Sequence, residues 1–260
     1  MTNGFDWTGG VTMSQQNIFD NEEFFNGYKQ LRENEDNYNV LLEQPAMNRL
    51  LPDLSGKRVL DLGCGYGHNC MDFVHRGAER VVGMDISQRM LDIANTESSH
   101  ERIEYVRMSM TDISRLTEGF DLIYSSLAVH YIEDFEALCK DMYALLNQGG
   151  YLLFSQEHPL VTATFGGHQH YNKDENGNAV SFTFSDYGKP GKRDTFWYVD
   201  GVEKYHRRFS DIITSLCRAG FVIDTVCEPL PDESAVSVRP NILIKEEIKP
   251  TFLIVKAQKR

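Results

Sequence analysis

Three glycines at alternate positions, Gly63, Gly65 and Gly67, constrain this chain more than any other feature of its sequence. They follow an aliphatic run at residues 57–62, which is typical of a central parallel strand buried on both faces. Because glycine has no Cβ, the backbone can turn tightly here and a ligand can lie against the main chain. The next segment, residues 66–76, is expected to open a helix whose free N–H groups face the same ligand. The stretch therefore predicts a strand, a loop and a helix that bind a cofactor.

The spacing of the glycines separates two classes of cofactor site. A dinucleotide fingerprint has the order Gly-x-Gly-x-x-Gly, which would place its third glycine where this chain has His68. Instead the pattern is Gly-x-Gly-x-Gly, and Asp61 stands two residues before the first glycine. In this respect the sequence resembles the class I S-adenosylmethionine-dependent methyltransferases, whose first motif reads much like residues 60–67. A nucleotide-dependent oxidoreductase stays open as an alternative class.

Three later stretches support the same resemblance and occur in the family's order. Residues 80–87 form an apolar run with Asp85 near its end, where a carboxylate can accept both hydroxyls of a ribose. Residues 120–131 are similar to the family's fourth-strand motif, and residues 145–154 to its helix, Gly-Gly turn and fifth strand. The resemblance implies an α/β fold with a seven-stranded Rossmann-like sheet, mostly parallel, with an antiparallel last strand and helices on both faces. We expect the first three strands at 57–62, 80–85 and 102–107, and the last two at 221–226 and 251–256.

The resemblance also implies S-adenosylmethionine as cofactor and S-adenosylhomocysteine as its product. Tyr28 and Arg32 lie one helical turn apart and could reach the cofactor's methionine carboxylate, although a surface pair on a packing helix explains them equally well. Related chains often carry an Asp after the third strand. Ser109 stands there in this chain, so adenine recognition is expected at the main chain that follows it or at Asp112. The candidate cofactor contacts are Tyr28, Arg32, Asp61, Gly63, Cys64, Gly65, Asp85, Ile86, Met110, Thr111 and Ser125.

Segments outside the sheet are expected to cover the cofactor and the acceptor. Residues 1–14 are expected to be mobile, and residues 15–260 to form a single domain. Helices at about 17–51 are interpreted as a lid, and residues from about 158 to 206 as a small β-rich cap inserted after the fifth strand. Asp200-Gly201 is a strong signal for a two-residue hairpin turn in that cap. Four prolines after residue 226 predict a long exposed connection to the last strand.

Methyl transfer requires an aligned acceptor, the exclusion of water and, where the acceptor is protonated, a base. Histidine is the usual base near neutral pH, and His130, His158 and His206 are the candidate catalytic residues. Glu157 could orient either of the first two. An isolated histidine is more often structural, so a structural role stands beside each of the three. No cluster of acids matches a metal site, and we predict no metal.

Composition limits the partners of the chain. A net charge of −12, without long basic clusters, argues against nucleic acid, whose binding depends on Lys and Arg contacts to phosphate. No apolar run is long enough to predict a membrane-spanning helix, and the N-terminus lacks the pattern of a secretory signal. Five cysteines without a Cys-x-x-Cys pair indicate a reduced, cytoplasmic protein.

The sequence thus predicts a methyltransferase that acts on an oxygen or nitrogen of a small metabolite. The aromatic residues of the cap favour an aromatic or amphipathic acceptor. Two alternatives stay open: a relative that keeps the cofactor site without transferring a methyl group, and a methyltransferase that acts on RNA or protein. The chain is expected to be a monomer or a homodimer.

Overall fold

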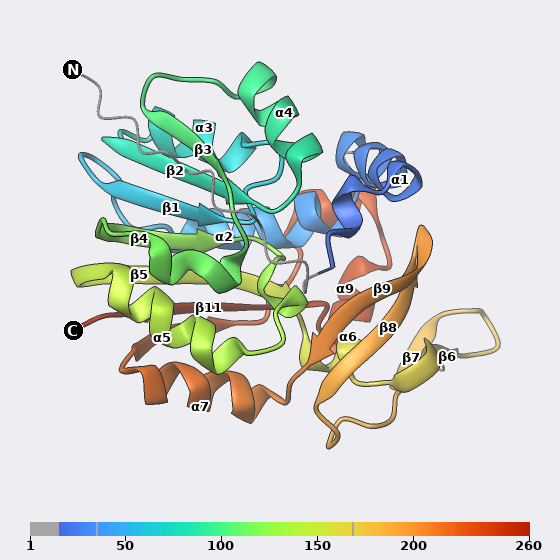
Figure 1. Ribbon diagram of the computed structural model, residues 1–260. Coiled ribbons are helices and arrows are strands. Elements are labelled where there is room, and N and C mark those ends of the chain that lie inside the picture. The colour runs from blue at the N-terminus through green and yellow to red at the C-terminus, as the bar shows by residue number, and fades with distance from the viewer. Residues whose placement is uncertain (1–15, 35, 168) are drawn as a thin grey trace, which may run out of the picture.

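The structure is a computed structural model that describes residues 16–34, 36–167 and 169–260, with only the backbone described for residues 31–33 and 167. The segment predicted to be mobile, residues 1–14, lies outside the described residues. One central sheet carries helices on both faces, and two β-hairpins lie beside one end of it (Figure 1). Among the described residues, no helix combines the length and the apolar character needed to cross a membrane.

The central sheet has seven strands in the order β10-β11-β5-β4-β1-β2-β3. β1 to β5 pair in parallel, and β11 pairs antiparallel with both β5 and β10. The strands are β1 Arg58–Leu62, β2 Arg80–Asp85, β3 Ile103–Arg107, β4 Phe120–Ser125, β5 Leu146–Glu157, β10 Val222–Cys227 and β11 Phe252–Gln258. This confirms the predicted Rossmann-like sheet with an antiparallel last strand. The carboxyl ends of β1, β2, β4 and β5 meet at one edge, where ligands bind in such sheets.

Each face of the sheet is covered by its own helices, because the strand residues alternate between two apolar clusters. Leu60 on β1 belongs to the cluster with α5 and α7, and Val59 to the cluster with α2 and α3. Ser87 caps the start of α4, since its side chain accepts a hydrogen bond from the Met90 N–H. The helices are α2 Gln44–Leu50, α3 His68–His75, α4 Gln88–Glu97, α5 Phe135–Leu145 and α7 Phe209–Ala219.

The chain before the sheet is helical on both sides of a break near residues 34–39. A 3₁₀ turn, Ile18–Asp20, and α1, Glu22–Glu33, precede the break, and a π-helix, Asn39–Glu43, that continues into α2 follows it. Phe24 of α1 is fully buried and packs edge-on against the aromatic rings of Trp197 and Tyr198. The N-terminal helix therefore contacts the hairpin that follows β5, although the two are far apart in sequence.

Two small antiparallel sheets lie between β5 and α7, together with the short helix α6, Pro159–Thr162. They are formed by β6 His170–Lys173 with β7 Ala179–Thr183, and by β8 Gly191–Trp197 with β9 Val199–His206. The prediction of a hairpin turn at Asp200-Gly201 is wrong. Thr195 pairs with Val202 and Trp197 with Val199, so the turn lies at Tyr198, whose φ is 62°.

The displaced turn has a physical reason. Asp200 and Gly201 together oppose Phe196 alone, which makes them a β-bulge within β9, and Gly201 supplies the positive φ that such a bulge favours. Placing the turn at Tyr198 lets the rings of Trp197 and Tyr198 pack against Phe24 of α1. Burial of these aromatic rings outweighs the local turn preference of Asp-Gly.

The prediction of a long exposed connection before β11 is also wrong in part. The segment contains two short helices, α8 Glu233–Val238 and α9 Ile242–Ile248. Ile242 is buried against Leu42 and Phe252, so α9 closes a third apolar cluster. The prolines in this segment lie outside both helices, where they limit helix length without preventing helix formation.

Candidate functional site

The glycine loop lies between the end of β1 and the start of α3. The N–H groups of Gly63 and Cys64 both donate to the carbonyl of Met84 on β2, at 2.7 and 3.0 Å, which fixes the loop across the strand ends. All three glycines have positive φ. A Cβ on Gly63 would lie 2.6 Å from the Ala128 Cβ, whereas a Cβ on Gly65 would meet no atom within 4 Å. Gly63 is thus required by packing, and Gly65 borders an open space beside the main chain.

Asp85, at the end of β2, lies against the same loop. Its carboxylate accepts hydrogen bonds from the N–H groups of Gly65 and Ser87, both at 2.9 Å. Burial raises the pKa of Asp85 to about 6 in spite of these hydrogen bonds. The carboxylate is held in place by main-chain donors and still faces a cavity.

Asp61 on β1 is fully buried behind the loop. Its Oδ2 accepts a weak hydrogen bond from the Cys70 thiol at 3.5 Å, and its Oδ1 has no hydrogen-bond partner among the described residues. Burial raises the pKa of Asp61 to about 7, and the nearby carboxylates of Asp85 and Glu43 add to that effect. A buried carboxylate oxygen without a donor is the kind of group that a ligand N–H stabilises.

A slot of about 100 Å³ adjoins Asp85 and the glycine loop. Its walls combine that carboxylate with thioether and aliphatic side chains, which suits a flat, weakly polar ring beside a hydroxylated sugar. The walls include Met84, Asp85, Ile86, Met90, Met108, Met110, Ala128 and Ile132.

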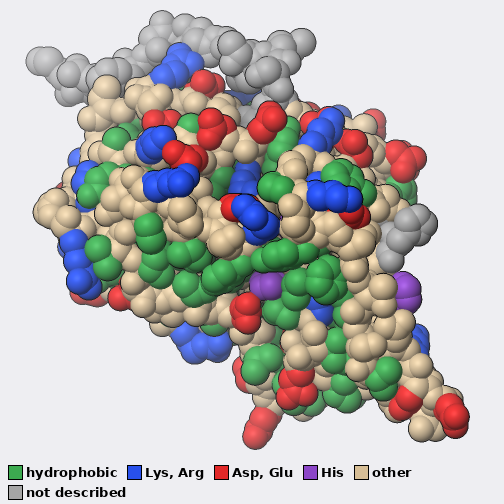
Figure 2. Space-filling model, turned by 90° about the horizontal axis from the view of Figure 1, so that it is seen from below, with side chains coloured by type: hydrophobic (Ala, Val, Ile, Leu, Met, Phe, Trp, Pro, Cys, Tyr) green, Lys and Arg blue, Asp and Glu red, His purple; other side chains and the backbone are tan. Residues whose placement is uncertain are grey.

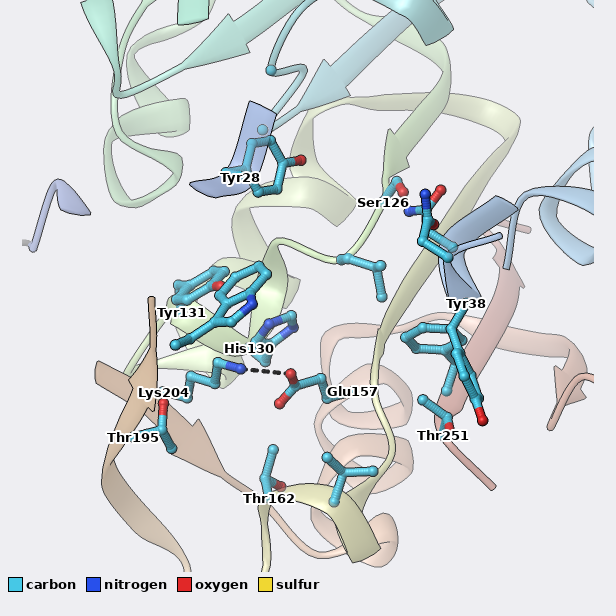
Figure 3. A pocket seen from close by; sticks show the side chains of 18 of the residues that line it. Tyr28, Tyr38, Ser126, His130, Tyr131, Glu157, Thr162, Thr195, Lys204 and Thr251 are labelled. Atoms are coloured by element: carbon cyan, nitrogen blue, oxygen red, sulfur yellow. Dashed lines mark hydrogen bonds and ion pairs between the residues drawn. The ribbon is translucent and has the colours of Figure 1, made fainter. Parts of the chain in front are cut away.

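A larger cavity, of about 830 Å³, opens on the other side of the loop. The two spaces share walls formed by Phe19, Tyr28, Gly63, Gly65, Ser126, Leu127 and Tyr131. Figure 3 shows side chains from α1, from the ends of β4 and β5 and from β9 pointing toward one another around the larger cavity. The slot and the cavity therefore meet at the glycine loop.

Three ionisable side chains lie together at the inner end of the larger cavity (Figure 3). The Lys204 ammonium on β9 pairs with Glu157 at the end of β5 at 2.5 Å, and it lies 4.9 Å from the centre of the Trp197 ring. Burial alone would raise the pKa of Glu157, but Lys204 and other nearby cations hold it below its ordinary value. The pair joins the β8–β9 hairpin to the central sheet.

His130 is the third member of this group and lies just after β4. It is buried, and its Nδ1 has no hydrogen-bond partner among the described residues. Burial lowers the pKa of His130 to about 4, because the attraction of Glu157 for the imidazolium is too small to offset it. The imidazole is therefore neutral near pH 7 and can donate or accept one hydrogen bond at Nδ1.

The other two candidate histidines lie outside both spaces. His158 begins α6, where its Nδ1 accepts from the Leu160 N–H at 3.1 Å and its Nε2 lies 2.9 Å from Glu228. His206 lies between the Thr162 hydroxyl and the Tyr187 carbonyl, each 2.9 Å from a ring nitrogen. Burial lowers the pKa of both histidines. Both ring nitrogens of each are engaged with the protein itself.

Of the candidate cofactor residues, some line the slot or the cavity and others do not. Those that line one of the two spaces are Tyr28, Gly63, Cys64, Gly65, Asp85, Ile86 and Met110. Ser125 is buried and donates to the Leu62 carbonyl, while Thr111 is exposed and bonded to Ser109. Asp61 lies behind the loop, and the side chain of Arg32 lies outside the described residues.

Sequence reasoning missed Lys204. The signal that could have found it is the alternation Val202, Lys204, His206, in which a lysine stands between two residues of a buried strand face. Among the described residues, no group of three or more His, Cys, Asp or Glu side chains is arranged to hold a metal ion. The absence of a metal stays a prediction.

Comparison with known proteins shows which family has this sheet and glycine loop. A family model described as "Methyltransferase domain" matches residues 59–150. The crystal structure of an S-adenosylmethionine dependent methyltransferase from Mesorhizobium loti is 35% identical, has a TM-score of 0.76, and covers 83% of this chain and 97% of that one. An uncharacterised Haemophilus influenzae protein is 36% identical over 82% of this chain and 86% of its own length.

Similarity to a relative with a named substrate is more limited. Trans-aconitate 2-methyltransferase of Deinococcus radiodurans is 29% identical over 45% of this chain and 47% of its own length. This chain spans about half the length of that relative. The matched part is therefore too short to carry an acceptor from one protein to the other.

Proposed function

The chain belongs to the S-adenosylmethionine-dependent methyltransferases, and from this premise we propose that it transfers a methyl group to an oxygen or nitrogen of a small molecule bound in the larger cavity. The observation that carries the proposal is the meeting of the slot and the cavity at the glycine loop. A cofactor bound on one side of the loop can there reach an acceptor held on the other.

S-adenosylmethionine, the cofactor of this family, supplies an electrophilic methyl group on a positively charged sulfur. The residues of the slot fit it. Asp85 would accept the ribose hydroxyls, Ile86 and Met110 would flank the adenine, and the open space at Gly65 lets the main chain approach the ligand. Asp61 lines neither space, but its partnerless Oδ1 lies buried behind the loop, where a cofactor N–H that reaches it would satisfy it.

Other cofactor contacts in the proposal rest on the sequence. Gly63 and Cys64 would present main-chain groups from the loop, and Tyr28 with Arg32 would approach the methionine carboxylate. Thr111 and Ser125 do not line either space and are engaged with neighbouring groups. We therefore assign these two residues a supporting role.

The chain's own contribution to transfer is to hold the acceptor and keep water out. Of the three candidate histidines, His130 alone lines the cavity, so we assign it to the acceptor and assign His158 and His206 to the structure of the cap. Trp197 and Tyr198 of the β8–β9 hairpin pack against α1 and would cover the acceptor. A cavity of this size favours a small molecule over a polymer.

The surface agrees with this choice of acceptor. On the face drawn in Figure 2, basic side chains lie among acidic ones. With a net charge of −12, this arrangement gives no support to an RNA substrate. A cytoplasmic setting and a monomeric or homodimeric state stay predictions from the sequence.

Calorimetric titration with S-adenosylmethionine and S-adenosylhomocysteine tests the proposal, with Asp85→Ala as the variant. We expect micromolar binding that the substitution weakens by about a hundredfold, since two charge-assisted hydrogen bonds contribute roughly 3 kcal/mol. Asp72→Ala, an exposed carboxylate on α3, is the matched control and should bind normally. If neither compound binds the wild-type protein, the proposal fails.

A transfer assay then tests the assignment of His130. His130→Asn should lower the rate with any small acceptor found in a metabolite screen, while cofactor binding stays unchanged. Equal rates for wild type and His130→Asn would remove His130 from the acceptor site. Cofactor binding without transfer to any acceptor would favour the non-methylating relative.

A further inference from the structure

Around Lys204 the larger cavity carries two cations, Arg193 and Lys204, which are cross-strand neighbours, and one carboxylate, Glu157. Its other carboxylates, Asp36 and Asp194, pair with Arg239 and Lys192. Glu157 is partly buried, and it is already paired with Lys204. Arg193 is 2% exposed, lines the same cavity and forms no ion pair with a carboxylate among the described residues. Its N–H groups donate instead to the carbonyls of residues 163, 189, 191 and 192, so it contributes charge and not free donors. In a protein of net charge −12, the wall is locally cationic.

Donors for an anion are also present. A Lys ammonium has three N–H groups, and one of them is bonded to Glu157. The remaining N–H groups of Lys204 and the partnerless Nδ1 of His130 belong to side chains that line the same space. The side chains of His130, Glu157 and Lys204 converge in Figure 3, below Tyr131 of the wall that the slot and the cavity share. An oxyanion bound there would gain hydrogen bonds and the field of Arg193.

Strong bases, by contrast, are lacking at this end of the cavity. The low pKa of His130, about 4, makes its imidazole a poor proton acceptor near pH 7. The pKa of Glu157 is also lowered, by Lys204. An alcohol, a phenol or an ammonium group must lose a proton as it is methylated, and neither side chain is suited to take that proton. A nucleophile that is already ionised needs no such help.

Building on the methyltransferase function proposed above, we propose that the acceptor is a small carboxylic acid, and that one oxygen of its carboxylate, held by Lys204 and His130, takes the methyl group. That oxygen forms the new bond to the methyl carbon while the bond from the carbon to sulfur breaks. The bonding pair stays on sulfur, which loses its positive charge as the carboxylate loses its negative charge. The products are a methyl ester and S-adenosylhomocysteine, and no proton is released.

Carboxylate binding can be measured on the protein saturated with S-adenosylhomocysteine. The fluorescence of Trp197, next to Lys204, reports occupancy of the cavity, with Trp7→Phe as the background so that a single tryptophan is observed. The probes are glutarate and benzoate, matched to pentanediol, benzyl alcohol and benzylamine, with inorganic phosphate as a test of charge alone. We expect the two carboxylates to bind, and the uncharged alcohols and the cationic amine to bind at least about tenfold more weakly. Phosphate should also bind at least about tenfold more weakly, because it has no carbon skeleton to contact the aromatic rings of the lining.

Variants of the ion pair assign the effect to Lys204. Lys204→Met should weaken carboxylate binding by more than about tenfold, because a charged partner in a buried site is removed, and Lys204→Arg should restore most of it. Lys140→Met is the matched control, since Lys140 is exposed on α5 and pairs with Glu136, and neither residue lines the cavity. Unchanged affinity for S-adenosylhomocysteine shows that each variant is folded.

The outcomes separate this inference from the proposed function. Failure of S-adenosylhomocysteine to bind the wild-type protein would overturn the methyltransferase site itself. If that compound binds, the inference is overturned when the alcohols, the amine or phosphate bind as tightly as the carboxylates. The inference is also overturned when neither carboxylate binds at a ligand concentration of tens of millimolar, or when the Lys204→Met variant binds the carboxylates as tightly as the wild-type protein does. At saturating S-adenosylmethionine, labelled methyl transfer to a carboxylate should in addition change little between about pH 6 and pH 8, because no base is required.

Discussion

The buried carboxylate of Asp61 should make the stability of this protein depend on pH, and Asp61→Asn should remove the part of that dependence that Asp61 contributes. Burial raises the pKa of Asp61 from 3.8 to about 7. Below about pH 4 the carboxyl is protonated in both the folded and the unfolded chain, so the shift has no effect on stability. Between about pH 4 and pH 7 the unfolded chain loses this proton while the folded chain keeps it. The free energy of unfolding therefore falls as pH rises through this window.

The size of the effect follows from the shift. About three pH units at 1.36 kcal/mol per unit amount to about 4 kcal/mol of lost stability once the pH exceeds 7. Between about pH 5 and pH 8 the loss is about 2.5 kcal/mol, because part of it has already occurred at the lower pH. The asparagine side chain of the Asp61→Asn variant would be uncharged throughout. Whatever its packing or hydrogen bonding costs, that cost is the same at each pH.

Urea unfolding of the wild-type protein and of Asp61→Asn at a series of pH values measures this difference. We expect the variant to gain about 2.5 kcal/mol relative to wild type between about pH 5 and pH 8. Asp72→Asn, which changes an exposed carboxylate on α3, should run parallel to wild type. A constant difference between Asp61→Asn and wild type would refute the argument, because it would mean that Asp61 titrates normally in the folded chain.

The same carboxylate links stability to the cofactor. If a cofactor N–H donates to the Oδ1 of Asp61, binding lowers the pKa of that carboxyl, and S-adenosylhomocysteine should bind more tightly at about pH 8 than at about pH 6. Asp61→Asn should show no such change. Equal pH dependence in both proteins would separate Asp61 from the cofactor while leaving the unfolding prediction intact.

Three further predictions concern the cap and the lid. A Cβ on Gly27 would lie 2.5 Å from the Tyr198 ring, so Gly27→Ala should push the β8–β9 hairpin away from α1 and weaken calorimetric binding of S-adenosylhomocysteine by about tenfold. Arg193→Gln should lower the free energy of unfolding by about 3 kcal/mol, measured in urea, because buried carbonyls of the cap lose charged donors. His158→Asn should lower the melting temperature and leave the transfer rate unchanged, since one ring nitrogen bonds to the Leu160 N–H of α6 and the other to Glu228 after β10.

Each of these predictions has a control and a contrary result. Gly188→Ala is the control for Gly27→Ala, because its added Cβ meets no atom within 4 Å. If the two variants bound S-adenosylhomocysteine equally well, the contact between α1 and Tyr198 would not be involved in binding. Arg239→Gln removes a half-exposed arginine that pairs with Asp36, and it should cost less than Arg193→Gln. A fall in transfer rate with unchanged stability in His158→Asn would return that residue to the acceptor site.

The sheet and the cofactor loop could be predicted because their signals are local. A strand buried on both faces needs an apolar run, and a turn at the end of β1 needs glycines at fixed positions, so the sequence of residues 58–67 is sufficient. The place of Asp85 could be predicted for the same reason, because it ends the next apolar run. α9 was missed because its short apolar stretch lies among prolines, and its burial against Leu42 depends on the lid.

The acceptor side could not be predicted, because its geometry depends on contacts between segments far apart in the chain. Lys204 becomes part of the cavity only because β9 turns back toward the end of β5, where Glu157 lies 47 residues earlier. That placement depends in turn on the position of the hairpin turn, which the aromatic contacts of Trp197 and Tyr198 with α1 move away from Asp200-Gly201. Moving the turn by one residue would exchange the two faces of the strand and turn Lys204 away from Glu157. The acceptor site therefore depends on the lid as much as on the cap that supplies its lysine.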